Sequence, residues 1–130
     1  ALPPGEAEAT LPLVVLNRLL LPLARSEGLL ACAIVDLDTG DLRASQHSGE
    51  PPPDLHALAG AMCAARLAHQ AVAPDEVPPD EVLVTTGARQ TLLRRLPGNA
   101  GLGFVAVLDQ RRANLTLLRF KLLDADRLLA

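Results

Sequence analysis

Aromatic residues are almost absent from this 130-residue chain, which has no tryptophan, no tyrosine and only two phenylalanines, Phe104 and Phe120. Proteins that stack nucleic-acid bases need flat side chains, so this scarcity argues against a nucleic-acid partner. The core must be built from leucine, valine and alanine. Because 49% of the residues are hydrophobic and 21% are charged, the composition is that of a globular protein and excludes wholesale disorder.

Cysteine is also scarce, and long membrane-spanning runs are missing. Cys32 and Cys63 each lie in an apolar run, which predicts two buried free thiols and favours a reducing cytoplasm over secretion. Residues 11–23 are very apolar but too short for a bilayer, which takes about twenty residues. Glu6 and Glu8 precede this run, whereas a secretory signal begins with positive charge. We expect a core helix here and no membrane insertion.

Charge is unevenly distributed along the chain. Residues 1–81 contain 12 acidic and four basic side chains, whereas residues 82–130 contain three acidic and eight basic ones. Such a dipolar chain could attract an oppositely charged partner. Alternatively, the two parts meet in the fold and their charges interleave on the surface.

The order of the expected elements predicts one domain over residues 10–130, preceded by a flexible N-terminal arm over residues 1–9. Gly28, Gly40 and the proline-rich segments mark the breaks between elements. The expected elements are a helix from Thr10 to about Glu27, strands 29–37 and 42–47, a helix 55–72, strands from Asp80 to Gly87, 91–96 and 103–108, and a last helix from Asn114 with Leu115, Leu118, Leu122 and Leu129 inward. Hairpin connections make the sheet antiparallel, and the two continuously apolar strands, 29–37 and 103–108, belong at its centre.

The helix over residues 55–72 is apolar nearly all round. Its polar residues, His56, Arg66, His69 and Gln70, do not share one face. A sheet covers only one side, so we expect two copies to associate through this helix; coverage by the first helix or the arm is the alternative. The expected dimer interface comprises Leu55, Leu58, Met62, Ala65, Arg66, His69, Val82 and Val84. A row of small residues, Ala57, Ala61, Ala64 and Ala68, would let another element approach closely.

No motif for catalysis or cofactor binding stands out. His56 and His69 lie about 220° apart around their helix and cannot share a metal ion. The acidic run 36–41 lacks the ligand order of a calcium loop and fits a hairpin turn. The glycines at 98–103 have the wrong spacing for a dinucleotide fingerprint. We therefore expect no catalytic residue, no metal and no cofactor, and a protein that is not an enzyme.

Three stretches of the chain form a recognisable set. They are Glu27–Gly40, which contains the first apolar strand and its Asp/Gly turn, the alanine-rich helix 55–72, and Phe104–Arg119, which joins a strand to the last helix. Together they resemble the roadblock (dynein light-chain) domain family. Thr116 departs from the family pattern because a glycine is common there.

The resemblance implies an α+β fold, an α/β/α sandwich in which a five-stranded antiparallel sheet has one helix on one face and two on the other. It implies a non-enzymatic homodimer whose second helices and third strands adjoin, and which binds a small Ras-like GTPase as a regulator or scaffold. The alternatives are a ligand-sensing α/β domain and a plain dimerisation module without a GTPase. Usage rich in leucine, alanine, arginine and proline favours a bacterial cytoplasm as the location.

Overall fold

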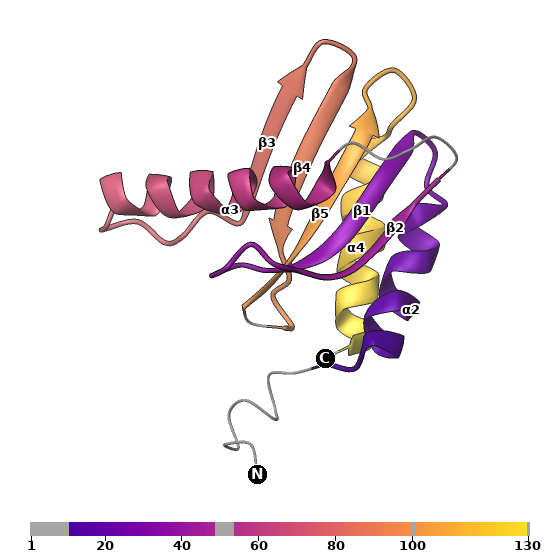
Figure 1. The fold of residues 1–130 in the computed structure, drawn as a ribbon, viewed down its shortest axis with the longest axis horizontal. Helices are drawn as coiled ribbons and strands as arrows, with labels where there is room; N and C mark the ends of the chain where they lie inside the picture. The colour runs from indigo at the N-terminus through magenta and orange to yellow at the C-terminus, as the bar shows by residue number, and fades with distance from the viewer. Residues whose placement is uncertain (1–10, 49–53, 100, 130) are drawn as a thin grey trace.

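The computed structural model describes residues 11–48, 54–99 and 101–129, so the expected arm over residues 1–9 lies outside the described part. Helices lie on both faces of one sheet (Figure 1). The elements, labelled as in Figure 1, are α2 (Leu13–Ala24), β1 (Leu29–Asp36), β2 (Leu42–His47), α3 (Leu55–Val72), β3 (Glu81–Thr86), β4 (Arg89–Arg95), β5 (Leu102–Asp109) and α4 (Leu115–Leu129).

The sheet has the strand order β2-β1-β5-β4-β3, and every neighbouring pair is antiparallel. The two continuously apolar strands, β1 and β5, pair with each other in the interior of the sheet, as their sequences predicted. This position follows from their composition, because only a strand covered on both faces can bury both sets of side chains. The outer strands β2 and β3 are more polar and form the two edges.

Helix boundaries follow local signals in the sequence. The side chain of Asp54 accepts a hydrogen bond from the Ala57 amide at 3.0 Å, and Asn114 accepts one from the Leu117 amide at 3.0 Å, so both residues cap the helix that follows them. Helix α2 begins after Pro12 rather than at Thr10, which lies outside the described residues. Pro22 lies inside the last turn of α2, where it removes one amide donor, and the helix ends at Ala24, before the expected Glu27.

The turns at both ends of β1 also match the sequence. Asp36 Oδ1 accepts hydrogen bonds from the amides of Asp38 and Thr39, and Gly40 closes this turn with a φ of 78°. The expected hairpin turn is therefore confirmed. Gly28 has a φ of 80°, and a Cβ atom there would lie 2.5 Å from the Ala113 nitrogen. Glycine is required at Gly28 by both its conformation and this close approach.

Two hydrophobic clusters fill the two sides of the sheet. One lies beneath α2 and α4 and includes Phe104, Cys32 and the buried leucines of both helices. Leu118 and Leu122 are buried in it and Leu115 packs at its border, as the helical spacing predicted, while the side chain of Leu129 lies outside the described part. The second, smaller cluster lies beneath α3 and includes Val105, Val107 and Cys63.

A buried carboxylate on α4 is hydrogen-bonded to the turn that connects β4 and β5. Asp126 is 3% exposed, and its two oxygens accept hydrogen bonds from the Gly98 amide at 2.8 Å and the Asn99 side chain at 3.1 Å. Both donors belong to the turn between β4 and β5. Because a buried carboxylate without partners is very unfavourable, these two bonds fix the position of the helix end relative to that turn.

Both cysteines are free and buried, as predicted, and neither thiol should react readily in the native protein. Burial raises the pKa of Cys32 to about 12, and it also raises the pKa of Cys63, so little thiolate forms at mildly alkaline pH. We expect slow alkylation of the native chain by iodoacetamide, followed by reaction of both thiols after denaturation, measured by mass spectrometry. Rapid labelling of either residue in the native state would contradict this expectation.

Candidate functional site

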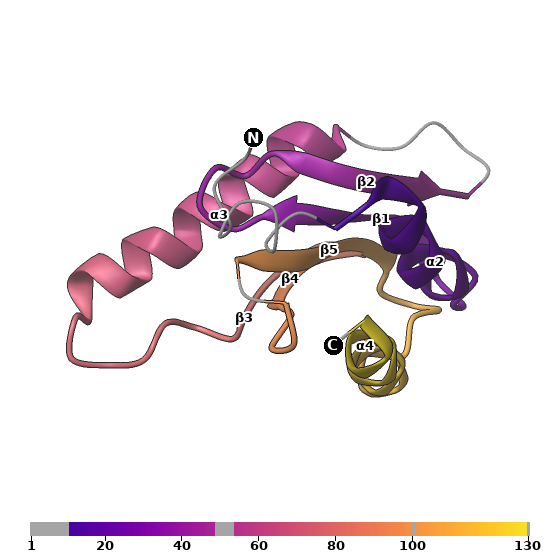
Figure 2. The ribbon, with the colours of Figure 1, turned by 90° about the horizontal axis from the view of Figure 1, so that it is seen from below.

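Among the helices of the described residues, α3 covers one face of the sheet, and α2 and α4 cover the other (Figure 2). Its inward side is formed by Leu55, Ala59, Met62 and Cys63, all of which are buried. They pack against the second hydrophobic cluster, which the strands β1, β4 and β5 provide. This side of the helix therefore belongs to the core of the single chain.

The prediction that Leu55 and Met62 belong to the dimer interface is wrong. Leu55 is 7% exposed and Met62 is 4% exposed in the single chain, so neither side chain is available to a second copy. Leu58 is half-buried in the same cluster. The physical reason is that the largest side chains of an amphipathic helix gain most from covering the sheet beneath it, which leaves the small residues outward.

The outward side of α3 consists of the small residues. Ala57, Ala61, Ala64 and Ala68 are all exposed, and Leu67 and Val72 flank this row. Val72 is 82% exposed because the C-terminal half of the helix extends beyond the edge strand β3 (Figure 1). The only charged residue of α3, Arg66, is half-buried, and its Nε donates a hydrogen bond to the Pro79 carbonyl at 3.1 Å. The exposed side of α3 therefore carries almost no charged group that would favour contact with water.

The other expected interface residues lie beside this surface. Ala65 and His69 are exposed on α3, and Val84 is exposed on β3, while Val82 is half-buried against the α3 cluster. A groove of about 510 Å³ separates α3 from β3 and from the connection over residues 73–80. Strand β3 pairs with β4 on one side and has no neighbouring strand on the other among the described residues, so the backbone groups on that outer side have no strand partner. The outward side of α3 and the free edge of β3 form the candidate interface.

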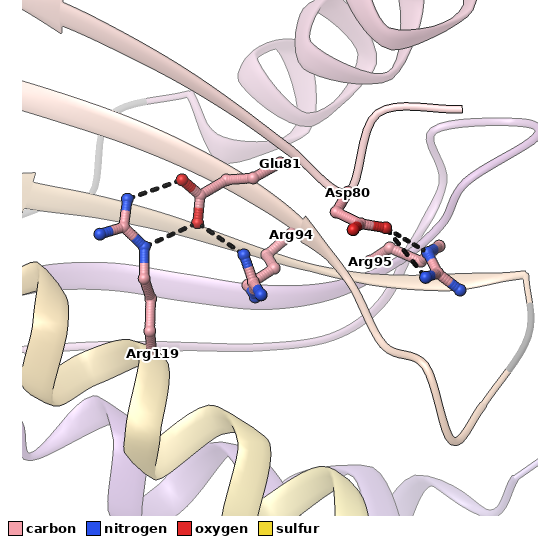
Figure 3. A network of polar contacts seen from close by, with 5 residues as sticks. All are labelled: Asp80, Glu81, Arg94, Arg95 and Arg119. Carbon is pink, nitrogen blue, oxygen red and sulfur yellow. Dashed lines mark hydrogen bonds and ion pairs between the residues drawn. The ribbon is translucent and has the colours of Figure 1, made fainter. Parts of the chain in front are cut away.

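A cluster of ion pairs on the opposite face was not predicted from the sequence. Glu81 on β3 accepts hydrogen bonds from Arg119 on α4, at 2.9 and 2.6 Å, and from Arg94 on β4 at 3.1 Å (Figure 3). A neighbouring pair joins Asp80 to Arg95 at 2.9 Å. Each of these pairs joins an acid from the first 81 residues to a base from the remainder, so the two oppositely charged parts of the chain do meet in the fold.

The hydrogen bonds from Arg119 lower the pKa of Glu81, although burial opposes this effect, and Arg94 contributes further. In return, Glu81 raises the pKa of Arg119. Glu81 is therefore a carboxylate at neutral pH, and it holds two guanidinium groups in fixed positions between the hairpin β3–β4 and α4. No local sequence pattern indicates this cluster, because it depends on the register that places Glu81 opposite Arg94 and on the docking of α4.

Neither metal chemistry nor a membrane crossing finds support in the described residues. They contain no group of three or more histidine, cysteine, aspartate or glutamate side chains placed to hold a metal ion. His56 and His69 are both exposed on α3. None of the helices in the described part combines the length and apolarity that a bilayer crossing needs.

Replacing Glu81 should destabilise the protein in a pH-dependent manner. Because the pKa of Glu81 is lowered in the folded state, its contribution is present at neutral pH and disappears as the pH falls below the ordinary value of 4.5. We expect Glu81→Gln to lower the free energy of unfolding by about 1 kcal/mol at pH 7, measured by urea denaturation. This deficit should shrink below pH 4.5.

The matched control is Asp80→Asn, which breaks the neighbouring, more exposed ion pair with Arg95. A pair of this kind contributes little, so this variant should resemble the unmodified protein at every pH. Equal effects of the two substitutions would show that Glu81 does not anchor the cluster.

Solved structures of similar fold identify the architecture. No protein-family model matches the chain, and no curated protein matches it in sequence. The gliding protein MglB from Thermus thermophilus superposes with a TM-score of 0.76 at 20% identity, over 90% of this chain and 87% of that chain. A Roadblock/LC7 domain from Streptomyces avermitilis gives a TM-score of 0.69 at 10% identity, over 92% and 95%. Myxococcus xanthus MglB gives 0.65 at 19% identity, over 90% and 89%.

At these identities the likeness shows the fold. It agrees with the arrangement described above, a five-stranded antiparallel sheet with α3 on one face and α2 and α4 on the other. The three stretches that resembled the family in sequence correspond to the β1 region, to α3 and to the junction of β5 with α4. The chain therefore has the roadblock, or dynein light-chain, fold.

Proposed function

We propose that this protein is a non-enzymatic homodimer that binds a small Ras-like GTPase, as a regulator or scaffold in a bacterial cytoplasm. The observation that carries the proposal is the uncharged outward side of α3, together with the free edge of β3 beside it. These are the elements through which the resemblance to roadblock domains implies dimerisation. The GTPase is implied by the same resemblance.

The dimer is supported by what the surface of α3 would gain from a second copy. A monomer leaves Val72 in water and Leu67 partly so, and completely burying an exposed side chain of this kind contributes about 1.5–3 kcal/mol, of which Leu67 would gain about half. The alanine row offers no bulk, so two α3 helices can approach closely, near the short end of the usual range of about 8–10 Å between axes. A two-fold axis through this row would bring the same surface of each copy together.

Substitution of Ala64 should separate the two copies. Ala64 is exposed in the middle of α3, so Ala64→Glu introduces a carboxylate at the interface without touching the core of the chain. We expect the unmodified protein to be a dimer and Ala64→Glu to be a monomer, measured by light scattering coupled to gel filtration.

Met62→Glu is not suitable for this test, because Met62 is buried in its own chain and the variant would unfold. The matched control is Ser45→Glu, an exposed position on the opposite edge strand β2. It should remain dimeric. A dimer that persists in Ala64→Glu, with unchanged circular dichroism, would exclude the α3 interface.

The GTPase partner is tested by affinity capture with nucleotide control. The protein is immobilised and exposed to lysate of its source organism containing GDP or a non-hydrolysable GTP analogue, and bound proteins are identified by mass spectrometry. We expect a small GTPase with the phosphate-binding motif G-x-x-x-x-G-K-S/T, enriched with one nucleotide over the other. Binding should then be reproduced with the purified GTPase by calorimetry.

Two other outcomes would replace the proposal. If no GTPase binds and the dimer is stable, a plain dimerisation or scaffold module remains. If a small metabolite instead raises the thermal stability of the protein, the ligand-sensing alternative is favoured, because a ligand that binds only the folded state stabilises it.

A further inference from the structure

Helix α4 carries apolar residues on its outward side as well as on its inward side. Leu118 and Leu122 are buried in the core, whereas Leu117, Phe120 and Leu123 are exposed. Phe120 is 64% exposed, although it is one of only two aromatic residues in the chain and the other, Phe104, is fully buried. Aromatic side chains are enriched at the centres of protein interfaces, so an exposed phenylalanine in such a chain indicates a contact.

Phe120 and Leu123 line a groove between α4 and β4. Its other lining residues are Thr116, Arg119 and Arg94, and its volume is about 240 Å³. The helix that lines it, α4, lies on the face of the sheet opposite α3 (Figure 2), and so does the groove. Dimerisation through α3 and β3 would therefore leave it open, and its occupant must be something other than the second copy in that dimer.

The Glu81 cluster determines the net charge beside the groove (Figure 3). Glu81 carries one negative charge and accepts hydrogen bonds from two guanidinium groups, so the cluster retains one positive charge. Arg119 uses two nitrogens for Glu81, whereas Arg94 uses only Nη1. Both arginines are partly exposed, so Arg94 retains N–H donors that an approaching anion can use.

We propose that this groove binds an acidic, amphipathic segment of a partner protein. An aliphatic or aromatic side chain of that segment packs on Phe120 and Leu123, and a carboxylate one helical turn away accepts hydrogen bonds from Arg94. Glu81 positions Arg94 and Arg119, so the guanidinium groups are ordered before the partner arrives. Helical segments that bind such grooves carry apolar anchors at i, i+3, i+4 and i+7.

A protein segment fits this site better than a membrane surface. The groove is concave and is lined by two different elements, whereas lipid binding relies on a projecting apolar face with many basic residues. On α4 itself, exposed Lys121 and Arg127 are partly offset by exposed Asp124. One surplus positive charge beside apolar side chains matches a short segment with a few carboxylates.

The test uses a fluorescein-labelled helical peptide with leucines at i, i+3, i+4 and i+7 and glutamates between them. A second peptide has lysine in place of every glutamate. Binding is followed by fluorescence anisotropy at low and high salt. We expect the acidic peptide to bind and the basic peptide to bind at least roughly tenfold more weakly, with the acidic peptide losing affinity in high salt.

Three variants locate the binding site. Phe120→Ser and Arg94→Glu should each weaken binding of the acidic peptide roughly tenfold or more. Leu117→Ser is the matched control, because Leu117 is an equally apolar, exposed residue of α4 that does not line the groove. It should bind as the unmodified protein does. Circular dichroism should show that all three variants are folded.

Several results would overturn the proposal. Equal binding of the acidic and basic peptides, no binding of the acidic peptide, or equal losses in Phe120→Ser and Leu117→Ser would each do so. Sedimentation with vesicles of phosphatidylcholine and phosphatidylserine, without binding of the acidic peptide, would instead assign the face to a membrane. The monomeric Ala64→Glu variant should bind the acidic peptide normally, so this test is independent of the proposed α3 interface.

Discussion

The length of α3 relative to the sheet is the constraint on which the proposed assembly depends. Eighteen residues make a helix about 27 Å long, whereas five strands about 4.8 Å apart make a sheet only about 19 Å wide. Because α3 runs across the strands (Figure 1), the sheet cannot cover its whole length, and its C-terminal part extends beyond β3. The described part of the chain has no other helix on this face, and the connection over residues 73–80 contacts only one side of the overhang, so the exposed alanine row is left for a partner in the proposed assembly.

The two faces of the sheet have different chemistry as a result of this arrangement. On the α3 face, the exposed helix surface is uncharged and built from small residues, which favours a close helix-to-helix contact. On the α4 face, a hairpin and a helix are tied together by the ion pairs of Glu81, next to an exposed phenylalanine. A close, uncharged contact suits a second copy of the same chain, whereas a charged groove suits a different protein. In the proposed assembly, one small domain would therefore join two kinds of partner without using the same residues twice.

Most of the fold could be predicted from the sequence because its signals are local. Continuous apolar runs located β1 and β5 in the sheet interior, and Asp54 and Asn114 marked the starts of α3 and α4. The candidate interface could be predicted only in part. Near-uniform apolarity around α3 gave no indication of which row faced the sheet, and the assignment of Leu55 and Met62 to a partner was therefore wrong. The Glu81 cluster was missed because strand register and helix docking, which bring its members together, have no signature in local spacing.

The buried carboxylate of Asp126 also couples the stability of two segments that are distant in the sequence. Its hydrogen-bond donors, the Gly98 amide and the Asn99 side chain, lie in a turn that is 27 residues or more away in sequence. The last turns of α4 and the β4–β5 turn therefore stabilise each other, because without that turn the acid would be buried without partners. Loosening of either segment would thus expose both the carboxylate and the end of α4, which covers the larger of the two clusters.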